Sequence, residues 1–425
     1  MKEQFSFTGR VIEGHHLGHT LGFPTANIVV TPGERVPAFG VYAAWVTLPD
    51  GTRHAAVTNL GVRPTVEEAG ALWVESYLLD FSGDLYGQEL TVTLCHFLRP
   101  ERRFPDVEAL RQAIARDLRE YKGMAVPPEQ IVVGAGAEYL YLLLAQLLGR
   151  EAVFAVEDPG YPKIRQVYGK CGIVCRPVPL DCQGMAPKAL AASGAMAVHI
   201  SPAHHYPTGL VTPIGRRHAL LRWAEASDGF IIEDDYDSEF RFTGRPIPTL
   251  QSIDTAGRVV YMNTFSQTIS PSMRVGFMVL PPRLLEQYRR ELDFYSCTVP
   301  ALDQHVLARF LDQGHYEQHL ARMRKEYRTR HDAVLASFRS SPFRNRITIS
   351  EQGAGLHFLL RLDTRESDGA LRDRAAALGV RLGFLSEYAA IPSPAYAHTL
   401  VVNYAGLSPA ALPEAMDLLA EIFGA

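Results

Sequence analysis

The chain lacks several features that would set it apart from ordinary globular proteins. Its first ten residues, MKEQFSFTGR, contain no apolar signal core, which points to the cytoplasm. No apolar run reaches the length that a membrane span needs, and the densest run, residues 139–148, fits a buried helix. The formal net charge is only −4 over 425 residues, so the composition indicates no global attraction to nucleic acid or to a membrane.

Cysteine is also scarce, with five residues and no CxxC spacing. An odd number without paired spacing favours free buried thiols over disulfides or a zinc site. Repeats and low-complexity segments are missing as well. What remains is a chain with 47% hydrophobic and 21% charged residues, long enough for two domains or more, each with its own core.

The stretch up to about residue 98 alternates short β-like runs with glycine and proline turns. The runs are GVYAAWVTL, HAAVTNLGV, WVESYLLDF and LTVTLCHFL. This rhythm predicts a small antiparallel β-barrel. Residues 106–121 then read as an amphipathic helix, with Asp106 as a cap and Leu110, Ile114 and Leu118 on one face.

From residue 130 onward, apolar strands alternate with helices. The strands are VFAVED, AVHIS, FIIEDD and VVYMNTF, and helical stretches cover 137–148 and 216–226. This alternation predicts a mainly parallel sheet covered on both faces. Long helices follow residue 283, including 315–338, and a smaller unit has strands near 357–362 and 400–404.

The segment GRVIEGHHLGHTLGFPTAN is dense in glycine, which lets backbone amides approach an anion closely. Spacing alone is a weak signal, since barrel glycines more often mark turns and bulges. The segment ends in FPTAN and is followed by GVYA at residue 40, TNLGVRPT at 58, VESYLLDF at 74, DLYG at 84 and LRPERRF at 98. With these motifs in this order, residues 1 to about 122 resemble the riboflavin kinase family.

That resemblance implies transfer of the ATP γ-phosphate to riboflavin, which gives FMN. Such a transfer needs backbone donors for the phosphates, oxygen ligands for Mg²⁺ and a carboxylate that takes the hydroxyl proton. By the family pattern, Thr25 and Asn27 supply the metal and phosphate contacts, and Glu75 is the base that activates the ribityl hydroxyl. The other residues assigned to the nucleotide site are Gly14, Gly18, Gly22 and Asn59.

Each assignment has a structural alternative. Glu75 can be a solvent-facing strand residue, Asn59 a turn residue and Arg63 a surface charge. Three histidines in the glycine-rich loop suggest a metal site, but they lack a set coordination spacing, which favours solvated loop histidines. They are His15, His16 and His19.

Residues from about 111 to the C-terminus carry a second set of motifs. They are VVGAGAEYLYLLLAQLL, EDPGYPKIR, SPAHHYPTG, IIEDDYDSEF, TFSQ and GLHFLLRL. Together they resemble the fold-type I aminotransferase module of MocR/GabR-type proteins, which holds pyridoxal phosphate (PLP). The expected fold is therefore a small antiparallel barrel followed by an α/β fold-type I PLP transferase-like domain with a smaller C-terminal α+β subdomain.

The resemblance also assigns the PLP contacts. Asp234 is expected against the pyridine nitrogen, Tyr236 at the ring oxygen and Tyr161 stacked on the ring. The phosphate contacts are assigned to Thr264, Ser266, Arg274 and the helix N-terminus after Gly134-Ala135-Gly136. Alternatively, Asp234 and its neighbour Asp235 act only as caps, and Tyr161 is a loop aromatic.

Glutamine stands where the family has its anchoring lysine. Gln267 has no nucleophilic amine and does not titrate, so it can neither form the internal aldimine nor shuttle a proton, and PLP would bind non-covalently. Gly406 falls where aminotransferases of this type can carry an arginine for the substrate carboxylate, which leaves Lys163 as the obvious partner.

In the family, a winged-helix DNA-binding domain, a linker and the first part of the PLP domain precede the helix that resembles LRQAIARDLREY. Here the kinase-like segment occupies that place, and the single helix fits both resemblances, which favours a recombined or engineered chain. We expect a barrel over 1–122 and a PLP domain over 123–425, with a large part at about 123–300 and a small part at about 330–425.

Three hypotheses follow. The first is a riboflavin kinase fused to a catalytically impaired aminotransferase-like module. The second is a MocR-like sensor that binds PLP or an amino compound without turnover, and the third is an aminotransferase whose lysine has been substituted. The expected ligands are riboflavin, ATP, Mg²⁺ and an amino compound. We expect no membrane contact and no nucleic-acid-binding domain, and, by analogy with PLP domains, a homodimer.

Overall fold

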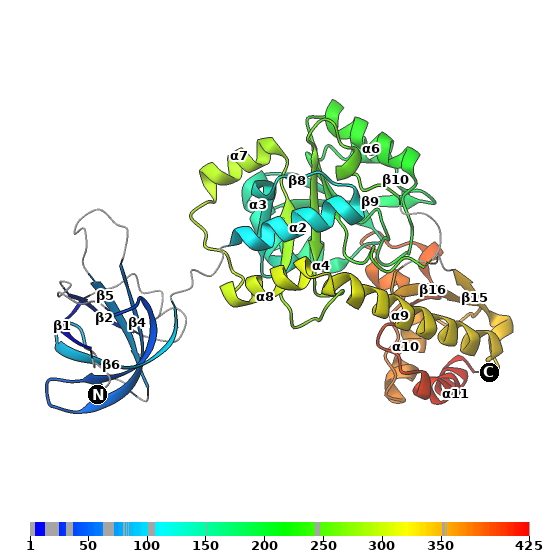
Figure 1. The fold of residues 1–425 in the computed structure, drawn as a ribbon. Helices are drawn as coiled ribbons and strands as arrows, with labels where there is room; N and C mark the ends of the chain where they lie inside the picture. Colours follow the sequence, from blue (N-terminus) through cyan, green and yellow to red (C-terminus); the bar gives the residue numbers. More distant parts are fainter. Residues whose placement is uncertain are drawn as a thin grey trace. The chain divides into compact units, whose positions relative to one another are not determined.

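The structure is a computed structural model, and it describes residues 5–12, 25–30, 37–62, 72–79, 81, 83, 85–100, 107–149, 151–242, 247–350, 353 and 355–424. The chain forms two compact units, Met1–Phe104 and Pro105–Ala425 (Figure 1). This division places the helix that follows residue 106 in the second unit, whereas the sequence placed the boundary after that helix, at 122.

The first unit is a closed antiparallel barrel with the strand order β1-β2-β5-β4-β3-β6 among its described residues. The strands are β1 (Ser6–Ile12), β2 (Thr25–Val30), β3 (Gly40–Thr47), β4 (Arg53–Val62), β5 (Leu72–Leu78) and β6 (Glu89–Pro100). Buried residues alternate with more exposed ones along β5, because one face of the strand lines the interior. Val46, Leu60 and Leu90 are fully buried there. The expected barrel is confirmed.

The second unit contains a sheet with the strand order β10-β9-β8-β11-β12-β13-β14-β7. Its strands are β7 (Ile131–Gly134), β8 (Val153–Asp158), β9 (Val174–Asp181), β10 (Gly184–Met185), β11 (Ala197–Ile200), β12 (Phe230–Asp234), β13 (Val259–Thr264) and β14 (Gly276–Val279). The pairs from β9 through β13 are parallel, whereas β14 runs antiparallel to both β13 and β7. The mainly parallel sheet is thus confirmed.

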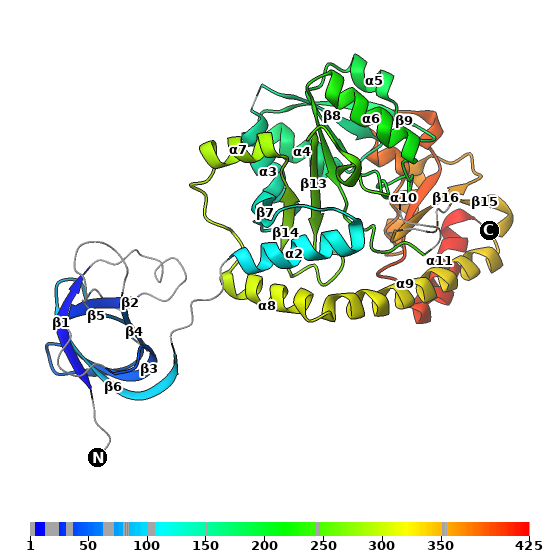
Figure 2. The same cartoon turned by 45° about the horizontal axis from the view of Figure 1, so that its top comes forward.

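Helices cover both faces of this sheet, as Figure 2 shows. One face packs against α3 (Ala137–Leu148), α4 (Pro162–Lys170) and α7 (Pro282–Glu291). The other face packs against α2 (Val107–Lys122), α5 (Pro187–Ala192), α6 (Ile214–Ala226) and α8 (Ala301–Asp312). The short 3-10 turns of this part are η1 (Pro128–Gln130) and η2 (Gln251–Ile253). Apolar residues on both faces of the strands explain why the sheet needs two helical layers.

Helix α2 belongs to the second unit because of its apolar face. Leu110, Ile114 and Leu118 are at most 1% exposed and pack with Leu307 and Leu311 of α8. The sequence predicted these three residues on one face. Their partners lie about 200 residues further along the chain, so the sequence did not show which unit the face covers.

A smaller part follows α9 (His315–Ser340), a long helix that begins beside α8. Its sheet has the order β15 (Ile347–Ser350), β16 (His357–Leu362) and β17 (Thr399–Asn403). It packs against α10 (Asp368–Ala377), α11 (Leu412–Phe423) and the end of α9. The turns are η3 (Arg344–Arg346), η4 (Leu385–Tyr388), η5 (Pro394–Tyr396) and η6 (Pro409–Ala411). Among the described helices, none combines the length and apolar character of a membrane span.

Candidate functional sites

Three polar residues of the barrel stand on one rung across β2, β5 and β4. Asn27 pairs directly with Glu75, and Glu75 pairs directly with Asn59. Directly opposed residues point to the same side of a sheet, with Cβ atoms about 5 Å apart. The intervening residues of β5 are the buried ones, so Glu75 lies on the face turned away from the interior. An amide, a carboxylate and a second amide therefore form one row of oxygen donors.

This row brings together three of the residues predicted for phosphoryl transfer. Thr25 lies two positions before Asn27 on β2, opposite Tyr77. Carboxylate and amide oxygens are the ligands that Mg²⁺ takes in proteins, so the donor set suits a metal bound to phosphate. The other predicted residues of this site lie outside the described part of the chain: Gly14, Gly18, Gly22, His15, His16, His19 and Arg63.

In the second unit, a cavity of about 380 Å³ is lined by the residues predicted to contact PLP, together with Gln267. They are Tyr161, Asp234, Tyr236, Thr264, Ser266, Gln267 and Arg274. Asp234 ends β12 and Thr264 ends β13, so both stand at the carboxyl edge of parallel strands, where α/β sheets bind ligands. The volume falls in the range of small-molecule sites.

Asp234 is held in place by two buried neighbours that the sequence reading missed. The Tyr141 hydroxyl donates a 2.5 Å hydrogen bond to Asp234 Oδ2, and His199 Nε2 lies 3.2 Å from the same oxygen. Burial, followed by the charge of Asp234, raises the pKa of Tyr141 well above its usual value, so its hydroxyl remains a donor. Tyr141 lies in the apolar run YLYLLLAQLL and His199 in the apolar run AVHIS. A polar side chain within an apolar run is the sequence signal that could have identified both residues.

The opposite end of the cavity is cationic. Arg274 Nη2 lies 2.6 Å from Glu138 Oε2, and Lys163 Nζ lies 2.8 Å from Glu138 Oε1. The hydrogen bond from Lys163 lowers the pKa of Glu138, and the same bond raises the pKa of Lys163. The Lys163 amine is therefore a protonated cation near neutral pH and a poor nucleophile.

Gly136 makes room for this arrangement at the start of α3. Its φ is +87°, and a Cβ atom there would lie 2.6 Å from Arg274 Nη2. A side chain at this position would displace the guanidinium. The cavity thus has a guanidinium, two hydroxyl side chains and a helix N-terminus at one end, with a carboxylate at the other. This layout fits PLP, which carries an anionic phosphate and a protonatable ring nitrogen.

Gln267 lines the cavity with these groups, and Lys163 does so as well. Tyr161 stands half exposed at the cavity, with its ring edge-on to that of Tyr206 at 5.9 Å between centroids. Gly406 is not among the residues that line the cavity, whereas Asn403 is. A Cβ atom at Gly406 would meet no described atom within 4 Å.

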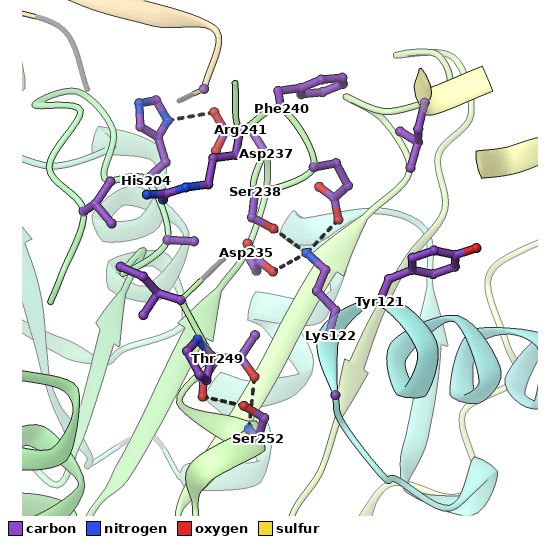
Figure 3. Close-up of a pocket in the computed structure, with 18 of the residues that line it drawn as sticks. Tyr121, Lys122, His204, Asp235, Asp237, Ser238, Phe240, Arg241, Thr249 and Ser252 are labelled. Carbon is purple, nitrogen blue, oxygen red and sulfur yellow. Dashed lines mark hydrogen bonds and ion pairs between the residues drawn. The ribbon is translucent and has the colours of Figure 1, made fainter. Parts of the chain in front are cut away.

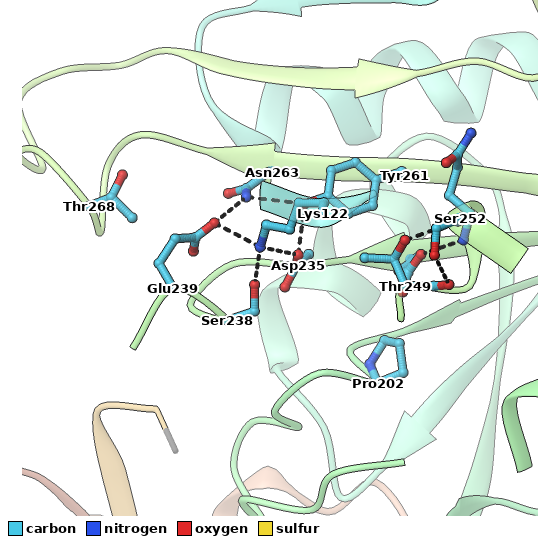
Figure 4. Close-up of polar contacts among 12 residues, drawn as sticks. Lys122, Pro202, Asp235, Ser238, Glu239, Thr249, Ser252, Tyr261, Asn263 and Thr268 are labelled. Carbon is cyan, nitrogen blue, oxygen red and sulfur yellow. Dashed lines mark hydrogen bonds and ion pairs between the residues drawn. The ribbon is translucent and has the colours of Figure 1, made fainter. Parts of the chain in front are cut away.

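A partly buried lysine that was not predicted, with 14% of its side chain exposed, fixes the loop after β12 (Figure 4). Lys122 Nζ lies 3.0 Å from both Asp235 Oδ2 and Glu239 Oε1, and it also donates to the Ser238 hydroxyl. Burial lowers the pKa of this ammonium, but the attraction of Asp235 and then of Glu239 outweighs burial and raises it. Because Asp235 follows Asp234 directly, the lysine helps to position the cavity carboxylate.

Beside this network lies a second cavity of about 800 Å³ (Figure 3). Its acidic lining residues are Asp117, Asp235, Asp237, Glu239 and Glu317. Burial, followed by the nearby charge of Glu239, raises the pKa of Asp117 to about 7. The cations in the lining are Lys122, Arg217, Arg241 and Arg324, so the cavity carries charges of both signs.

Comparisons with known proteins agree with both resemblances. Residues 1–125 match the riboflavin kinase family model, and residues 99–419 match the aminotransferase class I and II model. The first part is 45% identical over 123 residues to a bifunctional riboflavin kinase/FMN adenylyltransferase of Pseudomonas fluorescens. This alignment covers 29% of this chain and 39% of that protein.

The second part matches bacterial regulators. It is 36% identical over 299 residues to the uncharacterized HTH-type transcriptional regulator YhdI of Bacillus subtilis, covering 70% of this chain and 63% of that protein. It is 32% identical over 315 residues to the probable rhizopine catabolism regulatory protein MocR of Rhizobium meliloti, covering 74% of this chain and 63% of that protein. The chain thus spans less than two thirds of these relatives.

Among solved structures, a kynurenine aminotransferase of Pyrococcus horikoshii aligns with a TM-score of 0.65 and 23% identity, covering 76% of this chain and 82% of that one. This likeness shows the fold alone.

One expectation is wrong. The sequence reading excluded a nucleic-acid-binding domain, but several matching relatives are HTH-type transcriptional regulators by name. The expectation rested on the kinase-like segment, which occupies the place of the family's winged-helix domain in this sequence.

Proposed function

We propose a function for each part of the chain. The chain belongs to the aminotransferase class I and II family, whose model matches residues 99–419, and residues 1–125 match the riboflavin kinase model. The barrel transfers the γ-phosphate of ATP to the ribityl hydroxyl of riboflavin and releases FMN and ADP. The observation that carries this proposal is the rung Asn27–Glu75–Asn59, which sets a carboxylate between two amides in the part of the chain that matches the kinase model.

The barrel residues divide the chemistry between them. The Glu75 carboxylate accepts the hydroxyl proton as the riboflavin oxygen bonds to the γ-phosphorus and the bond to ADP breaks. Asn27 and Thr25 hold Mg²⁺ and the phosphates, and Asn59 orients the nucleotide. Bound Mg²⁺ neutralises the charge of the phosphate oxygens. Because Glu75 and Asn27 are adjacent on the rung, the proton acceptor and the phosphate contact lie about one strand spacing apart.

The aminotransferase-fold part binds PLP without a covalent anchor. Arg274, Thr264 and Ser266 hold the phosphate, Asp234 faces the ring nitrogen, Tyr236 the ring oxygen and Tyr161 the ring face, in the cavity that all of them line. PLP supplies an electron-withdrawing ring when it is bound. Gln267 takes the place of the family lysine, and its amide offers a hydrogen bond but no nucleophile. Transamination is therefore lost.

A sensing role is the second candidate for this part. It is favoured by the relatives, which are named transcriptional regulators, and by a cavity that fits PLP and lacks an anchoring amine at residue 267. In this role an amino compound binds beside PLP and changes the protein without turnover. Because the matching relatives are named as regulators, the proposal includes an influence on transcription.

Purified full-length protein tests both parts. With riboflavin, ATP and Mg²⁺, we expect FMN to form in proportion to enzyme, read by chromatography with fluorescence detection. Absence of FMN, with riboflavin binding still measurable, would overturn the kinase assignment. With PLP, an amino acid and a keto acid, we expect bound PLP and no exchange of amino groups. Steady formation of a new amino acid would overturn the non-catalytic assignment.

A further inference from the structure

Two histidines and an aspartate that were not among the predicted site residues form a buried cluster in the second unit, at the edge of the cavity of about 380 Å³ that two of them line. His204 follows β11, Asp237 follows β12 and His357 begins β16, and each is at most 5% exposed. One ligand-type atom from each lies within 4.8 Å of the others. We propose that these three residues bind a divalent transition metal, with Zn²⁺ as the best match.

The pair His204 and Asp237 is already close to a metal-binding geometry. His204 Nδ1 lies 2.9 Å from Asp237 Oδ2, so the two atoms share one proton, and a dashed line marks this contact in Figure 3. Zinc binds both nitrogen and carboxylate oxygen at about 2.0 to 2.2 Å, and an ion between the two atoms replaces that proton. Metal binding at this site therefore releases a proton.

His357 is oriented as a metal ligand. Its Nε2 lies 3.1 Å from the carbonyl oxygen of Pro207, which only accepts, so Nε2 carries the proton. The lone pair then remains on Nδ1. Histidines that bind metals usually donate their second ring N–H to a carbonyl or carboxylate, which fixes the tautomer and the ring orientation. The rings of His357 and His204 lie 4.6 Å apart between centroids, which brings the two imidazoles to one point.

Asp237 supplies an oxygen that needs a partner. Its Oδ1 is buried and has no hydrogen-bond partner among the described residues, and the residue is 1% exposed. A buried carboxylate oxygen without a partner is costly and usually marks a missing water, ion or ligand. Asp234, Asp235 and Glu239 add negative charge nearby, and Lys122, Arg217, Arg241 and Arg324 add positive charge, so the argument for a cation rests on the ligand atoms themselves.

The backbone is shaped for the His204 ring. Gly355 has a φ of +73°, and a Cβ atom there would lie 1.8 Å from His204 Cε1. Only glycine admits the imidazole at this distance. Asp237 also lines both cavities, of about 380 and 800 Å³, so there is open space for a water as fourth ligand. Three protein ligands and one open position are a common zinc arrangement.

The metal would join three segments that are far apart in the sequence. His204 and Asp237 lie in loops at the carboxyl edge of the large sheet, next to Tyr236 of the PLP cavity, and His357 lies in the small sheet. The ion therefore fixes the small sheet to the large one beside that cavity. This function requires no reaction at the metal.

The test uses the full-length chain without an affinity tag, treated with chelator and then titrated with Zn²⁺ in the absence of PLP. We expect one ion per chain by elemental analysis, proton release seen in buffers of different ionisation enthalpy, and a raised Tm. Substitution with Co²⁺ should give the intense visible absorption of a four-coordinate site. The variant His357→Gln should bind Zn²⁺ at least about 100-fold more weakly, since second-shell changes alone cost 10 to 100-fold.

Two controls keep the test decisive. His218→Gln removes an exposed histidine on α6 and should leave the titration unchanged. If His357→Gln does not fold, Asp237→Asn keeps the shape of the side chain and should abolish the Co²⁺ spectrum while far-ultraviolet circular dichroism stays the same. Equal Zn²⁺ binding by parent and folded ligand variants, or no Co²⁺ spectrum in the parent, would show a hydrogen-bonded cluster without metal and overturn the proposal.

Discussion

Arg274 and Glu138 form an ion pair at the cationic end of the small cavity, with 2.6 Å between Nη2 and Oε2. The same carboxylate holds Lys163 through its other oxygen at 2.8 Å. Glu138 thus forms ion pairs with Arg274 and Lys163, the two cations that a phosphate in the cavity would otherwise contact. An anion that enters the cavity must compete with this carboxylate.

Glu138→Gln should therefore strengthen PLP binding. The neutral amide releases Arg274 and Lys163, and because exposed ion pairs are worth about 0.2 to 1 kcal/mol, the gain should be about 1.5-fold to 5-fold in Kd. An absorbance titration with PLP measures it. Glu291→Gln, which removes the carboxylate of an exposed pair on α7, is the control and should change nothing. Weaker binding in Glu138→Gln would mean that Glu138 positions Arg274 instead.

Glu75→Gln should reduce FMN formation by about 10²-fold to 10⁴-fold, the usual contribution of a general base. Riboflavin binding should persist, because the amide keeps the shape of the side chain. Steady-state FMN formation and riboflavin fluorescence quenching give the two readouts. Glu89→Gln, at an exposed position on β6 of the same barrel, should keep the parental rate. A parental rate in Glu75→Gln would place the base elsewhere.

Gln267→Lys should create a covalent attachment point for PLP. In the parent protein, PLP should leave on dialysis and give no adduct at residue 267 after borohydride reduction, because an amide does not condense with an aldehyde. The variant should give a reduced adduct that mass spectrometry maps to residue 267. Ser272→Lys adds a lysine in the same loop outside the cavity lining and should give none. An adduct in the parent at Lys163, Lys170 or Lys188 would contradict this assignment.

Lys122→Met should destabilise the second unit by about 3 to 5 kcal/mol, because it leaves the buried carboxylates of Asp235 and Glu239 without their shared cation. Urea unfolding monitored by tryptophan fluorescence measures the change. Lys188→Met, at an exposed position on α5, should stay within about 0.5 kcal/mol of the parent. Similar stability of the two variants would show that the network tolerates an unpaired carboxylate.

The stability of the second unit should fall as pH rises from 6.5 to 8. Burial raises the pKa of Glu157 to about 8, so the folded protein keeps a proton that the unfolded chain has lost. Asp117 and Glu233, with pKa values raised to about 7 by burial, act in the same direction. Burial lowers the pKa of His205 to about 3, so its contribution to stability rises with pH through the unfolded value of 6.5 and opposes the decline only at the lower edge of this window.

Each proton that only the folded state holds gives a slope of about 1.4 kcal/mol per pH unit. Glu157→Gln should therefore make the decline shallower, as read from urea unfolding at half-unit steps of pH. Glu414→Gln, exposed on α11, should reproduce the parental slope. An unchanged or steeper slope in Glu157→Gln would contradict the raised pKa.

Much of the fold followed from local pattern. The runs GVYAAWVTL and WVESYLLDF became β3 and β5 of the barrel, and VFAVED and FIIEDD became β8 and β12 of the large sheet, because alternation and apolar runs report directly on one-sided and two-sided burial. The strands β1, β2, β9, β10, β14 and β15 were not predicted. In β9 less exposed residues alternate with exposed ones along the whole strand, and prolines stand at 177 and 179, which weakens the apolar signal.

The sequence by itself determined the order of the two units, the strands at their centres and the residue types that line the cavity, since these depend on neighbours within a few positions. Only the tertiary structure decided that α2 covers the second unit, that Lys122 neutralises Asp235 across 113 residues, and that Glu138 pairs with Arg274 across 136. It also decided that His204, Asp237 and His357 meet. Charge pairing and ligand geometry depend on distance in space, and spacing along the chain does not encode that distance.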